Sequence, residues 1–410
     1  MNILIINYRK MLVGGIETYI HKVVKANYEA GNKIIWIAES PLTISPIYEK
    51  LFNKDCIEIV YSNIHGLSWG TLPKMNISNH DDVVILSFGF FEHARALEFK
   101  KNNTKFKVRA FFLIPHFTGP LVFPEQYFNN NSFIKKKIGK IYKKWICGNQ
   151  VIFFGKRHYE VIESNYKLDI LDENKNMVYR FDTRKPFSES EVRNRYKRKE
   201  FRIVGAGRFD FPHKGFFIGL IKTFGEFKAK YENLTLYLIG EPIGAIDSMG
   251  MMRDVVDSFP AEVKKDIHFL KNMPEDELVD YYKTCDLTVG VAGCASMSAK
   301  NGVLTLPARH YDYSCEVYGF CPESKDRTLD STPGLPLSEY LEKALKMTED
   351  EYVEQCKRSY DAYVFPEVNR NYYFENKATA GTYDLSLLDL WFLKSLFFFS
   401  KVVFKLKLFR

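Results

Sequence analysis

Two cationic residues, six positions apart, stand out in the segment VGAGRFDFPHKGFF. An apolar run leads to Arg208, and Lys214 comes just before a stretch with helical periodicity. Arg can hold a phosphate group through two parallel N–H donors, and Lys adds a compact point charge. Two cations beside the start of a helix can therefore clamp a diphosphate. Surface cations near an ordinary turn are the alternative interpretation.

A pair of glycines near the N-terminus points to related chemistry. Gly14 and Gly15 follow the apolar run NILIIN and precede a segment of helical period, with Glu17 in its first turn. Such a turn leaves helical N–H groups unpaired, and glycine allows close approach, so it suits an anion or a sugar hydroxyl. The helix dipole favours Glu17 whatever the function. A plain tight turn is the alternative, and the absence of GxGxxG removes the main support for a nicotinamide cofactor.

The elements that must position these residues follow an alternating pattern. Apolar runs rich in β-branched residues alternate with segments of helical period, which is typical of a doubly wound parallel sheet. The pattern occurs twice. The expected strands are 2–8, 33–39, 57–62, 81–89 and 106–116, then 201–210, 234–242, 266–272, 286–293 and 302–308, and the expected helices include 16–28, 217–231 and 275–284. We therefore expect an α/β protein with two Rossmann-like domains that face a cleft.

Length supports the same division. A chain of 410 residues, of which 46% are hydrophobic, is too long for one compact core. We expect an N-terminal Rossmann-like domain at 1–183 and a C-terminal one at 201–365. The polar, charge-dense segment 184–200 is expected to be a linker with a surface helix, and 366–410 a tail.

Composition limits the partners and the compartment. The formal charge of +8 and the pI near 8.8 favour anionic partners. Seven scattered cysteines without a CxxC pair suggest neither a disulfide framework nor a zinc site. The first residues form an expected strand rather than a secretory leader, so the cytoplasm is expected. Nucleic-acid binding is not expected, because no recognised module accompanies the basic residues.

Two basic segments suggest contact with a membrane surface. In 135–144 the lysines surround an apolar stripe of helical period, and 384–410 mixes leucine and aromatic residues with lysine. Lys394 and Lys401 interrupt the tail, which leaves no stretch near the roughly 20 apolar residues that span a bilayer. We expect both segments to lie on an anionic leaflet. A solvated helix and a tail packed against a domain are the alternatives.

The motifs as a group resemble those of GT-B glycosyltransferases of the family 4 type. The resemblance rests on GGIE at 14–17, VGAGRFDFPHKG, LTLYLIGEP and MPEDELVDYYKTCDLTV, and it covers most of residues 1–310. It implies a nucleotide-diphosphate sugar (NDP-sugar) bound mainly by the C-terminal domain and an acceptor on the N-terminal one. Arg208 and Lys214 would bind the donor diphosphate and stabilise the leaving nucleotide, so no metal and no cofactor would be needed.

The resemblance implies further roles at single positions. Gly15 would face the donor phosphate or the acceptor. Gly240 and Glu241 would lie near the nucleoside, with 270–273 flanking the base. His116 matches a place where many relatives hold a histidine near the transferred sugar, although an isolated histidine after a strand is more often structural.

One departure from the family pattern concerns two glutamates that relatives carry eight residues apart, one near the sugar and one on the ribose. Here Val289 and Met297 occupy those positions, and neither can accept a ribose hydroxyl. Glu316 is a candidate carboxylate from a later loop. Contacts to a phosphate at the start of the following helix can still come from three small residues: Gly293, Ser296 and Ser298.

The leading hypothesis is metal-independent transfer of a sugar from an NDP-sugar to an acceptor hydroxyl, retaining by analogy. The basic segments favour a lipid-linked saccharide acceptor, as in bacterial capsule, O-antigen or glycolipid synthesis, and a peripheral enzyme on the inner face of the cell membrane. An NDP-sugar epimerase shares the two-domain fold, but no additional acid and base residues support it. A non-catalytic partner subunit that binds a nucleotide sugar or glycan fits the missing glutamates, whereas Arg208 and Lys214 argue against it.

Overall fold

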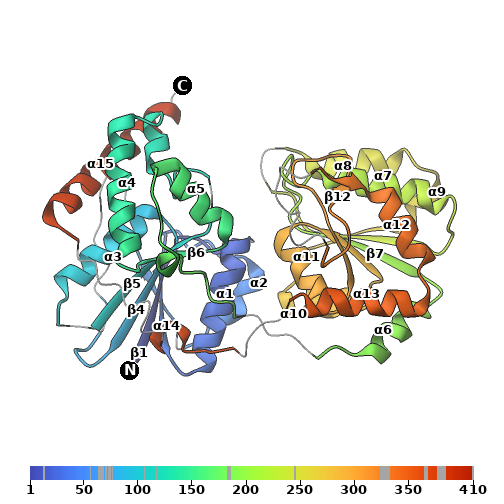
Figure 1. The fold of residues 1–410 in the computed structure, drawn as a ribbon, viewed down its shortest axis with the longest axis horizontal. Helices are drawn as coiled ribbons and strands as arrows, with labels where there is room; N and C mark the ends of the chain where they lie inside the picture. The colour runs from blue at the N-terminus through green and yellow to red at the C-terminus, as the bar shows by residue number, and fades with distance from the viewer. Residues whose placement is uncertain are drawn as a thin grey trace. The chain divides into compact units, whose positions relative to one another are not determined.

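The computed structural model divides the chain into two units: unit 1, Met1–Asp182 with Val368–Arg410, and unit 2, Thr183–Glu367 (Figure 1). The structure describes all residues except 13, 56, 63–68, 70, 71, 73, 74, 76, 106, 117, 182–185, 244, 245, 324–332, 364–367, 376–384, 409 and 410, and it describes only the backbone of 404–408. Each unit is described by itself.

Unit 1 is built on a six-stranded parallel sheet with the strand order β3-β2-β1-β4-β5-β6. The strands are β1 (Asn2–Asn7), β2 (Lys33–Ala38), β3 (Ile57–Tyr61), β4 (Asp82–Ser87), β5 (Lys107–Ile114) and β6 (Val151–Phe153). The helices between them are α1 (Gly15–Glu29), α2 (Pro46–Phe52), α3 (Phe90–Asn102), α4 (Ser132–Cys147) and α5 (Lys156–Tyr166), with the 3-10 helices η1 (Pro124–Phe128) and η2 (Asp172–Asn174). The five strands expected in this half are confirmed.

The central strand β1 shows why the apolar runs are continuous. Ile3 and Ile5 pack into one buried cluster, while Leu4 and Ile6 pack into another. Successive side chains of a strand point to opposite faces, so both faces of this sheet are covered.

Unit 2 contains a five-stranded parallel sheet with the order β11-β10-β7-β8-β9. Its strands are β7 (Phe201–Ala206), β8 (Leu234–Ile239), β9 (Ile267–Leu270), β10 (Leu287–Gly290) and β11 (Leu304–Pro307), followed by a small antiparallel pair, β12 (Glu316–Val317) and β13 (Leu335–Pro336). Its helices are α6 (Glu189–Tyr196), α7 (Phe216–Lys228), α8 (Ser248–Asp257), α9 (Ala261–Lys264), α10 (Glu275–Lys283), α11 (Ala292–Ala299), α12 (Leu337–Lys346) and α13 (Glu349–Asp361). The second set of five expected strands is confirmed, and with it the doubly wound α/β class.

Both sheets have a point at which the chain reverses its direction of travel across the sheet. This switch point lies between β1 and β4 in unit 1 and between β7 and β10 in unit 2. Loops at the carboxyl ends of the two flanking strands diverge there, and open parallel sheets bind ligands in the resulting crevice.

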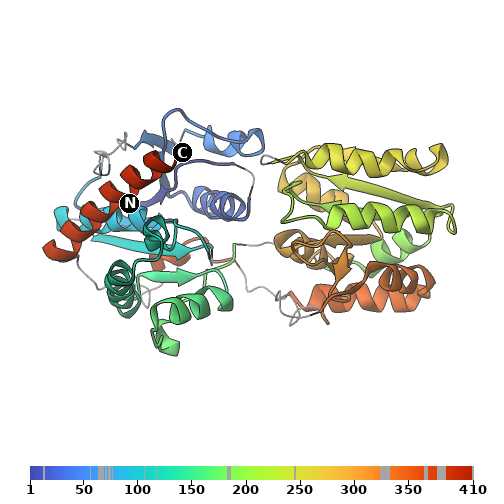
Figure 2. The same ribbon diagram turned by 90° about the horizontal axis from the view of Figure 1, so that it is seen from above.

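The C-terminal segment returns to unit 1. The hydroxyls of Tyr373, in α14 (Tyr372–Glu375), and Tyr19 lie 2.5 Å apart. Helix α15 (Leu387–Leu408) contacts α3, and Lys394 binds Glu98 at 2.6 Å (Figures 1 and 2). Within the described part of the chain, no helix combines the length and the apolarity that a membrane crossing requires.

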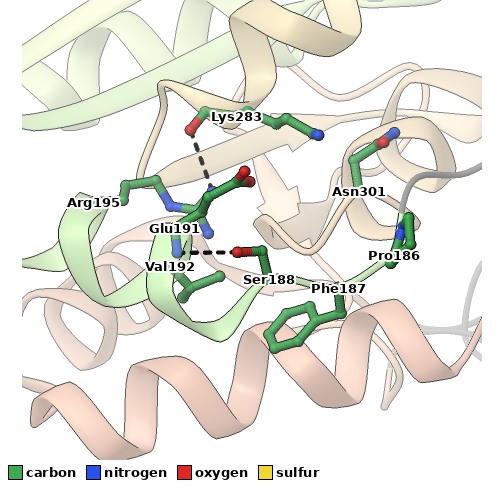
Figure 3. A pocket seen from close by; sticks show the side chains of 8 residues that line it. All are labelled: Pro186, Phe187, Ser188, Glu191, Val192, Arg195, Lys283 and Asn301. Carbon is green, nitrogen blue, oxygen red and sulfur yellow. Dashed lines mark hydrogen bonds between the residues drawn. The ribbon is translucent and has the colours of Figure 1, made fainter.

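The segment 184–200 is part of unit 2, where α6 packs through a buried arginine. Arg195 donates to the hydroxyl of Tyr352 at 3.0 Å and to the carbonyl of Gly302 at 2.7 Å. Figure 3 shows the small cavity beside it, lined by residues of α6 and of the segment 186–188 before it, together with Lys283 and Asn301. Its volume of about 10 Å³ is room for no more than a water molecule, so we assign it no ligand.

Helix α7 and the segment before β12 approach each other very closely. A Cβ added to Gly219 would lie 2.3 Å from the carbonyl carbon of Ser314, and the backbone N–H of Tyr311 donates to the carbonyl of His213 at 3.0 Å. This contact therefore fixes the position of the loop that carries Arg208 and Lys214.

We expect Gly219→Ala to destabilise the protein by about 1–3 kcal/mol, because the added methyl group meets backbone atoms in a packed interior. Helix propensity alone would give the opposite sign. Urea unfolding measures the change. Gly15→Ala is the control, since a Cβ there meets no atom within 4 Å. Equal stability of Gly219→Ala and the unmodified protein would contradict the close packing.

Candidate diphosphate-binding site

The loop after β7 folds back so that Lys214 returns to the end of its own strand. Gly207 follows the strand with φ +145°, and the backbone N–H of Lys214 donates to the carbonyl of Asp210 at 2.8 Å. A Cβ added to Gly207 would lie only 2.8 Å from the Nζ atom of Lys214. Glycine is therefore required at 207 both for the backbone angle and for the ammonium group beside it.

The Lys214 ammonium is a buried cation without a counter-ion in the described structure. The residue is 9% exposed, and no hydrogen bond or ion pair joins its Nζ atom to any described residue. Burial lowers the pKa of Lys214; among the smaller effects, Cys294 and Asp210 raise it and Arg208 lowers it. A buried charge without a partner is costly, so an anion bound here would relieve the cost.

Arg208 belongs to the same loop and is more accessible. Its side chain is 31% exposed, and its guanidinium nitrogen lies 3.7 Å from an Asp210 carboxylate oxygen. The same oxygen lies 3.7 Å from Nδ1 of His213. These separations are too long for strong hydrogen bonds, so the guanidinium can turn toward a ligand. The structure thus brings Arg208 and Lys214 together.

Helix α11 adds a set of N–H donors at the same edge of the sheet. It begins directly after β10, the strand that flanks β7 at the switch point, and its N-cap residue Val291 makes no capping hydrogen bond. A Cβ on Gly293 would meet no atom within 4 Å, and the nearby Cys294 thiol raises the pKa of Lys214. An uncapped helix N-terminus beside an unpaired cation is suited to a phosphate group.

The two serines of α11 have different surroundings. Ser298 is fully buried, and its hydroxyl accepts a hydrogen bond from Thr305 at 3.0 Å, so it cannot contact a ligand at the helix start. The hydroxyl of Ser296 donates to the carbonyl of Gly293 at 3.1 Å. The expectation for Ser298 is therefore corrected. Glu316 is bound to Arg309 at 2.6 Å.

Gly240 and Glu241 lie at the carboxyl end of the neighbouring strand β8. A Cβ on Gly240 would lie 2.0 Å from the carbonyl oxygen of Gly207, so glycine lets the two strand ends meet. Glu241 is exposed and accepts a hydrogen bond from the amide of Asn272 at 3.1 Å. These two residues therefore lie at the carboxyl edge of the unit 2 sheet, next to the loop that follows β7.

The site residues expected in unit 1 follow two different strands, β1 and β5. Gly14 is the N-cap of α1, and Gly15 is exposed with open space around it, at the switch point after β1. Glu17 is 9% exposed and accepts a hydrogen bond from the Tyr8 hydroxyl at 2.8 Å, which favours a structural role. His116 is exposed and follows β5, one strand beyond the switch point.

Sequence analysis did not identify a charged cluster at the same edge of unit 1. Arg9, two residues after β1, lies 2.7 Å from Glu92 in the first turn of α3, and Arg95 lies 3.1 Å from the same carboxylate oxygen. Burial by itself would raise the pKa of Glu92, but the two guanidinium groups lower it to about 2. The sequence did hold a signal for this cluster, because Arg9 and Glu92 are charged residues that follow the two strands at the switch point, β1 and β4.

No metal cluster occurs among the residues that the structure describes, since no three His, Cys, Asp or Glu side chains gather there. Neither a protein-family model nor any curated protein sequence matches the chain.

Solved structures are similar to the chain over most of its length. A glycosyltransferase from Rickettsia africae aligns over 98% of both chains at 12% identity, with a TM-score of 0.54. HepE of Anabaena, solved with UDP and glucose, aligns over 88% of this chain and 93% of its own at 13% identity, with a TM-score of 0.53. The trehalose-6-phosphate synthase OtsA aligns over 88% and 95% at 11% identity, with a TM-score of 0.53.

Binding of a diphosphate should be coupled to protonation of Lys214. Burial holds the pKa of free Lys214 below its usual 10.5, and a nearby diphosphate would raise it again. At a pH between the pKa of Lys214 in the free protein and its higher pKa in the complex, binding of the diphosphate takes up a proton. The affinity therefore falls as the pH rises above the pKa of the free protein.

Calorimetric titration of UDP at about pH 9, in two buffers of different ionisation enthalpy, measures this uptake. We expect the uptake to disappear in Lys214→Met. The same proton uptake in the variant would exclude Lys214 as its source.

At this level of sequence identity the similarity establishes the fold alone. The chain has the GT-B fold.

Proposed function

We propose that the protein is a glycosyltransferase that moves a sugar from an NDP-sugar to an acceptor hydroxyl. The observation that carries the proposal is the unpaired Lys214 ammonium, placed with Arg208 and the open start of α11 at the switch point of unit 2. The similar HepE structure contains UDP and glucose, which supports a nucleotide-sugar donor.

The two cations would act mainly in the transition state. Negative charge builds up on the diphosphate as its bond to the anomeric carbon loosens, and cations already in place stabilise that charge more than the ground state. Arg208 and Lys214 would supply the neutralisation that a divalent ion provides elsewhere, so we propose that the reaction needs no metal. Retention of configuration is part of this proposal, by analogy with the family that the motifs resemble.

Binding of the nucleoside must differ from the family pattern. Val289 is fully buried in β10, and Met297 packs against a second apolar cluster, so neither position offers a carboxylate to the ribose. Glu241 and Asn272, joined by a hydrogen bond at the ends of β8 and β9, are the polar groups that we propose for the nucleoside.

The same observation about Val289 and Met297 favours a second candidate, a non-catalytic subunit that binds a nucleotide sugar. Incubation with NDP-sugars separates the candidates. Release of the nucleoside diphosphate, by transfer or by hydrolysis, supports the enzyme, whereas binding without turnover supports the subunit. Isomerisation of the sugar would indicate an epimerase.

Arg208→Ala should lower turnover of the NDP-sugar roughly 100- to 1,000-fold, because one stabilising contact to the leaving diphosphate is lost. The rate of nucleoside diphosphate release measures the loss. Arg253→Ala, on the exposed surface of α8, is the matched control and should keep normal turnover. Normal turnover in Arg208→Ala would refute the assignment of Arg208.

We further propose that unit 1 binds an anionic membrane surface through α4 and α15, and that the enzyme acts at the inner face of the cell membrane on a lipid-linked saccharide. One face of α15 packs against unit 1 through Leu393, Leu396 and Phe397. The large apolar side chains on its remaining surface are exposed: Leu387, Leu388, Trp391, Phe398 and Phe399.

Helix α4 provides cations beside this apolar surface. Its described exposed lysines are Lys136, Lys137, Lys140, Lys143 and Lys144. Lys144 binds Asp389 of α15 at 2.6 Å, so the two helices are neighbours (Figure 1). Apolar side chains next to lysines suit insertion at the headgroup level of an anionic leaflet. A role in surface polysaccharide synthesis follows from such an acceptor.

Trp391→Glu should reduce flotation of the protein with phosphatidylglycerol vesicles at least tenfold, because it places a carboxylate where Trp391, 70% exposed, would enter the leaflet. Met251→Glu makes the same kind of change on unit 2 and should not alter flotation. Unchanged flotation of Trp391→Glu, or no flotation of the unmodified protein, would contradict the membrane proposal.

A further inference from the structure

The charged cluster at the switch point of unit 1 is built around a single carboxylate oxygen. Arg9 donates to Oε1 of Glu92 from two nitrogens, at 3.0 and 2.7 Å, and Arg95 donates to the same atom at 3.1 Å. The other carboxylate oxygen lies over Gly89, 2.2 Å from where a Cβ would sit. Glu92 thus fixes both guanidinium groups just beyond the ends of β1 and β4.

A third cation comes from the C-terminal helix. The Nζ atom of Lys401, in α15, lies 5.4 Å from the centre of the Phe397 ring, and the Arg95 guanidinium lies 5.7 Å from the same centre. Burial lowers the pKa of Lys401, Arg9 and Arg95 lower it further, and Glu92 and Glu39 act in the opposite direction. Lys401 therefore belongs to the same cluster, although it is 392 positions after Arg9 (401 − 9).

The cluster carries more positive than negative charge. Arg9 and Arg95 both form ion pairs with the Glu92 carboxylate, and no hydrogen bond or ion pair joins the Lys401 ammonium to any described residue. The Nε atom of Arg95 is buried, also without a hydrogen-bond partner in the described structure. The excess charge is partly buried, which is unfavourable unless an anion binds.

The carboxylates of Glu98 and Glu39 are near enough to raise the pKa of Arg95 and of Lys401, respectively, but each also has a lysine partner of its own. Lys394 binds Glu98 at 2.6 Å, and Lys10 lies 3.8 Å from Glu39. A ligand can reach the cluster through Arg9, whose side chain is 34% exposed, and through Lys401, which is only partly buried, whereas the Arg95 side chain is 1% exposed.

We propose that Arg9 and Lys401 bind a phosphate or pyrophosphate group of the acceptor, and that the buried guanidinium of Arg95 adds positive charge behind them. Arginine in a fixed orientation recognises phosphate oxygens through paired N–H donors, and lysine adds a point charge. The inference rests on the proposed function, since it places the acceptor on unit 1. It deepens that function by naming the acceptor class: a saccharide or lipid that carries a phosphate or pyrophosphate.

The position of Lys401 favours a lipid pyrophosphate. The helix that carries it exposes Trp391 and Phe399 to the surroundings, while Lys401 lies over the Phe397 ring that Arg95 also approaches. A pyrophosphate that joins a saccharide to a lipid lies at the level of the membrane surface. One helix can therefore contact the leaflet and the phosphate of the same acceptor.

The test uses full-length protein carrying Arg208→Ala and Lys214→Met, which removes the proposed donor site. Titration with inorganic pyrophosphate, and separately with geranyl pyrophosphate, then reports on unit 1 alone. Adding Lys401→Gln should weaken binding of both probes at least tenfold without lowering the melting temperature, because Lys401 makes no ion pair among the described residues. Lys222→Gln, at an exposed lysine of α7 outside the cluster, is the control and should leave the affinity unchanged.

Arg9→Gln provides a second variant and should weaken both probes as well. Equal affinity with and without Lys401→Gln, or no pyrophosphate binding once the donor site is removed, would overturn the inference. The inference would also be overturned if Lys401→Gln weakened binding to phosphatidylglycerol vesicles as much as it weakened binding to pyrophosphate. Lys401 would then bind lipid headgroups in general. If pyrophosphate binds as tightly after Arg208→Ala and Lys214→Met as before, the donor site fails instead, so the two failures are distinguishable.

Discussion

The burial of one ammonium group without a counter-ion is the constraint on which the site in unit 2 depends. Lys214 is held at the end of β7, where solvation is poor and its ammonium group forms no ion pair with any described residue. The favourable interactions in the rest of unit 2 must offset the free-energy cost of burying this charge. Binding of an anion offsets this cost. The attraction becomes stronger as negative charge on the anion increases, so the site is suited to stabilise a departing diphosphate.

Backbone packing creates the place for that ammonium group. Glycine at 207 and 240 lets the ends of β7 and β8 meet, and glycine at 219 lets the segment before β12 lie on α7. A parallel sheet with its switch point between β7 and β10 brings the first turn of α11 to the same edge. The chemistry therefore depends on small residues that themselves contact no ligand.

The sequence could predict whatever is local along the chain. Continuous apolar runs located ten strands because both faces of each sheet are buried, whereas β6, with three residues, gave too short a signal. Arg208 and Lys214 lie in one loop, so spacing was enough to pair them. Ser298 was misjudged because a residue list does not show which face of α11 turns inward. The cluster of Arg9, Glu92 and Lys401 joins distant segments, and only the fold brings them together.

The most direct test is a crystal structure of the protein with a bound nucleoside diphosphate. We expect a phosphate oxygen about 3 Å from the Nζ atom of Lys214, with another accepting a hydrogen bond from a backbone N–H in the first turn of α11. Arg208 should turn from Asp210 toward the same diphosphate. A diphosphate bound elsewhere, with Lys214 still unpaired beside Gly207, would contradict the proposed donor site.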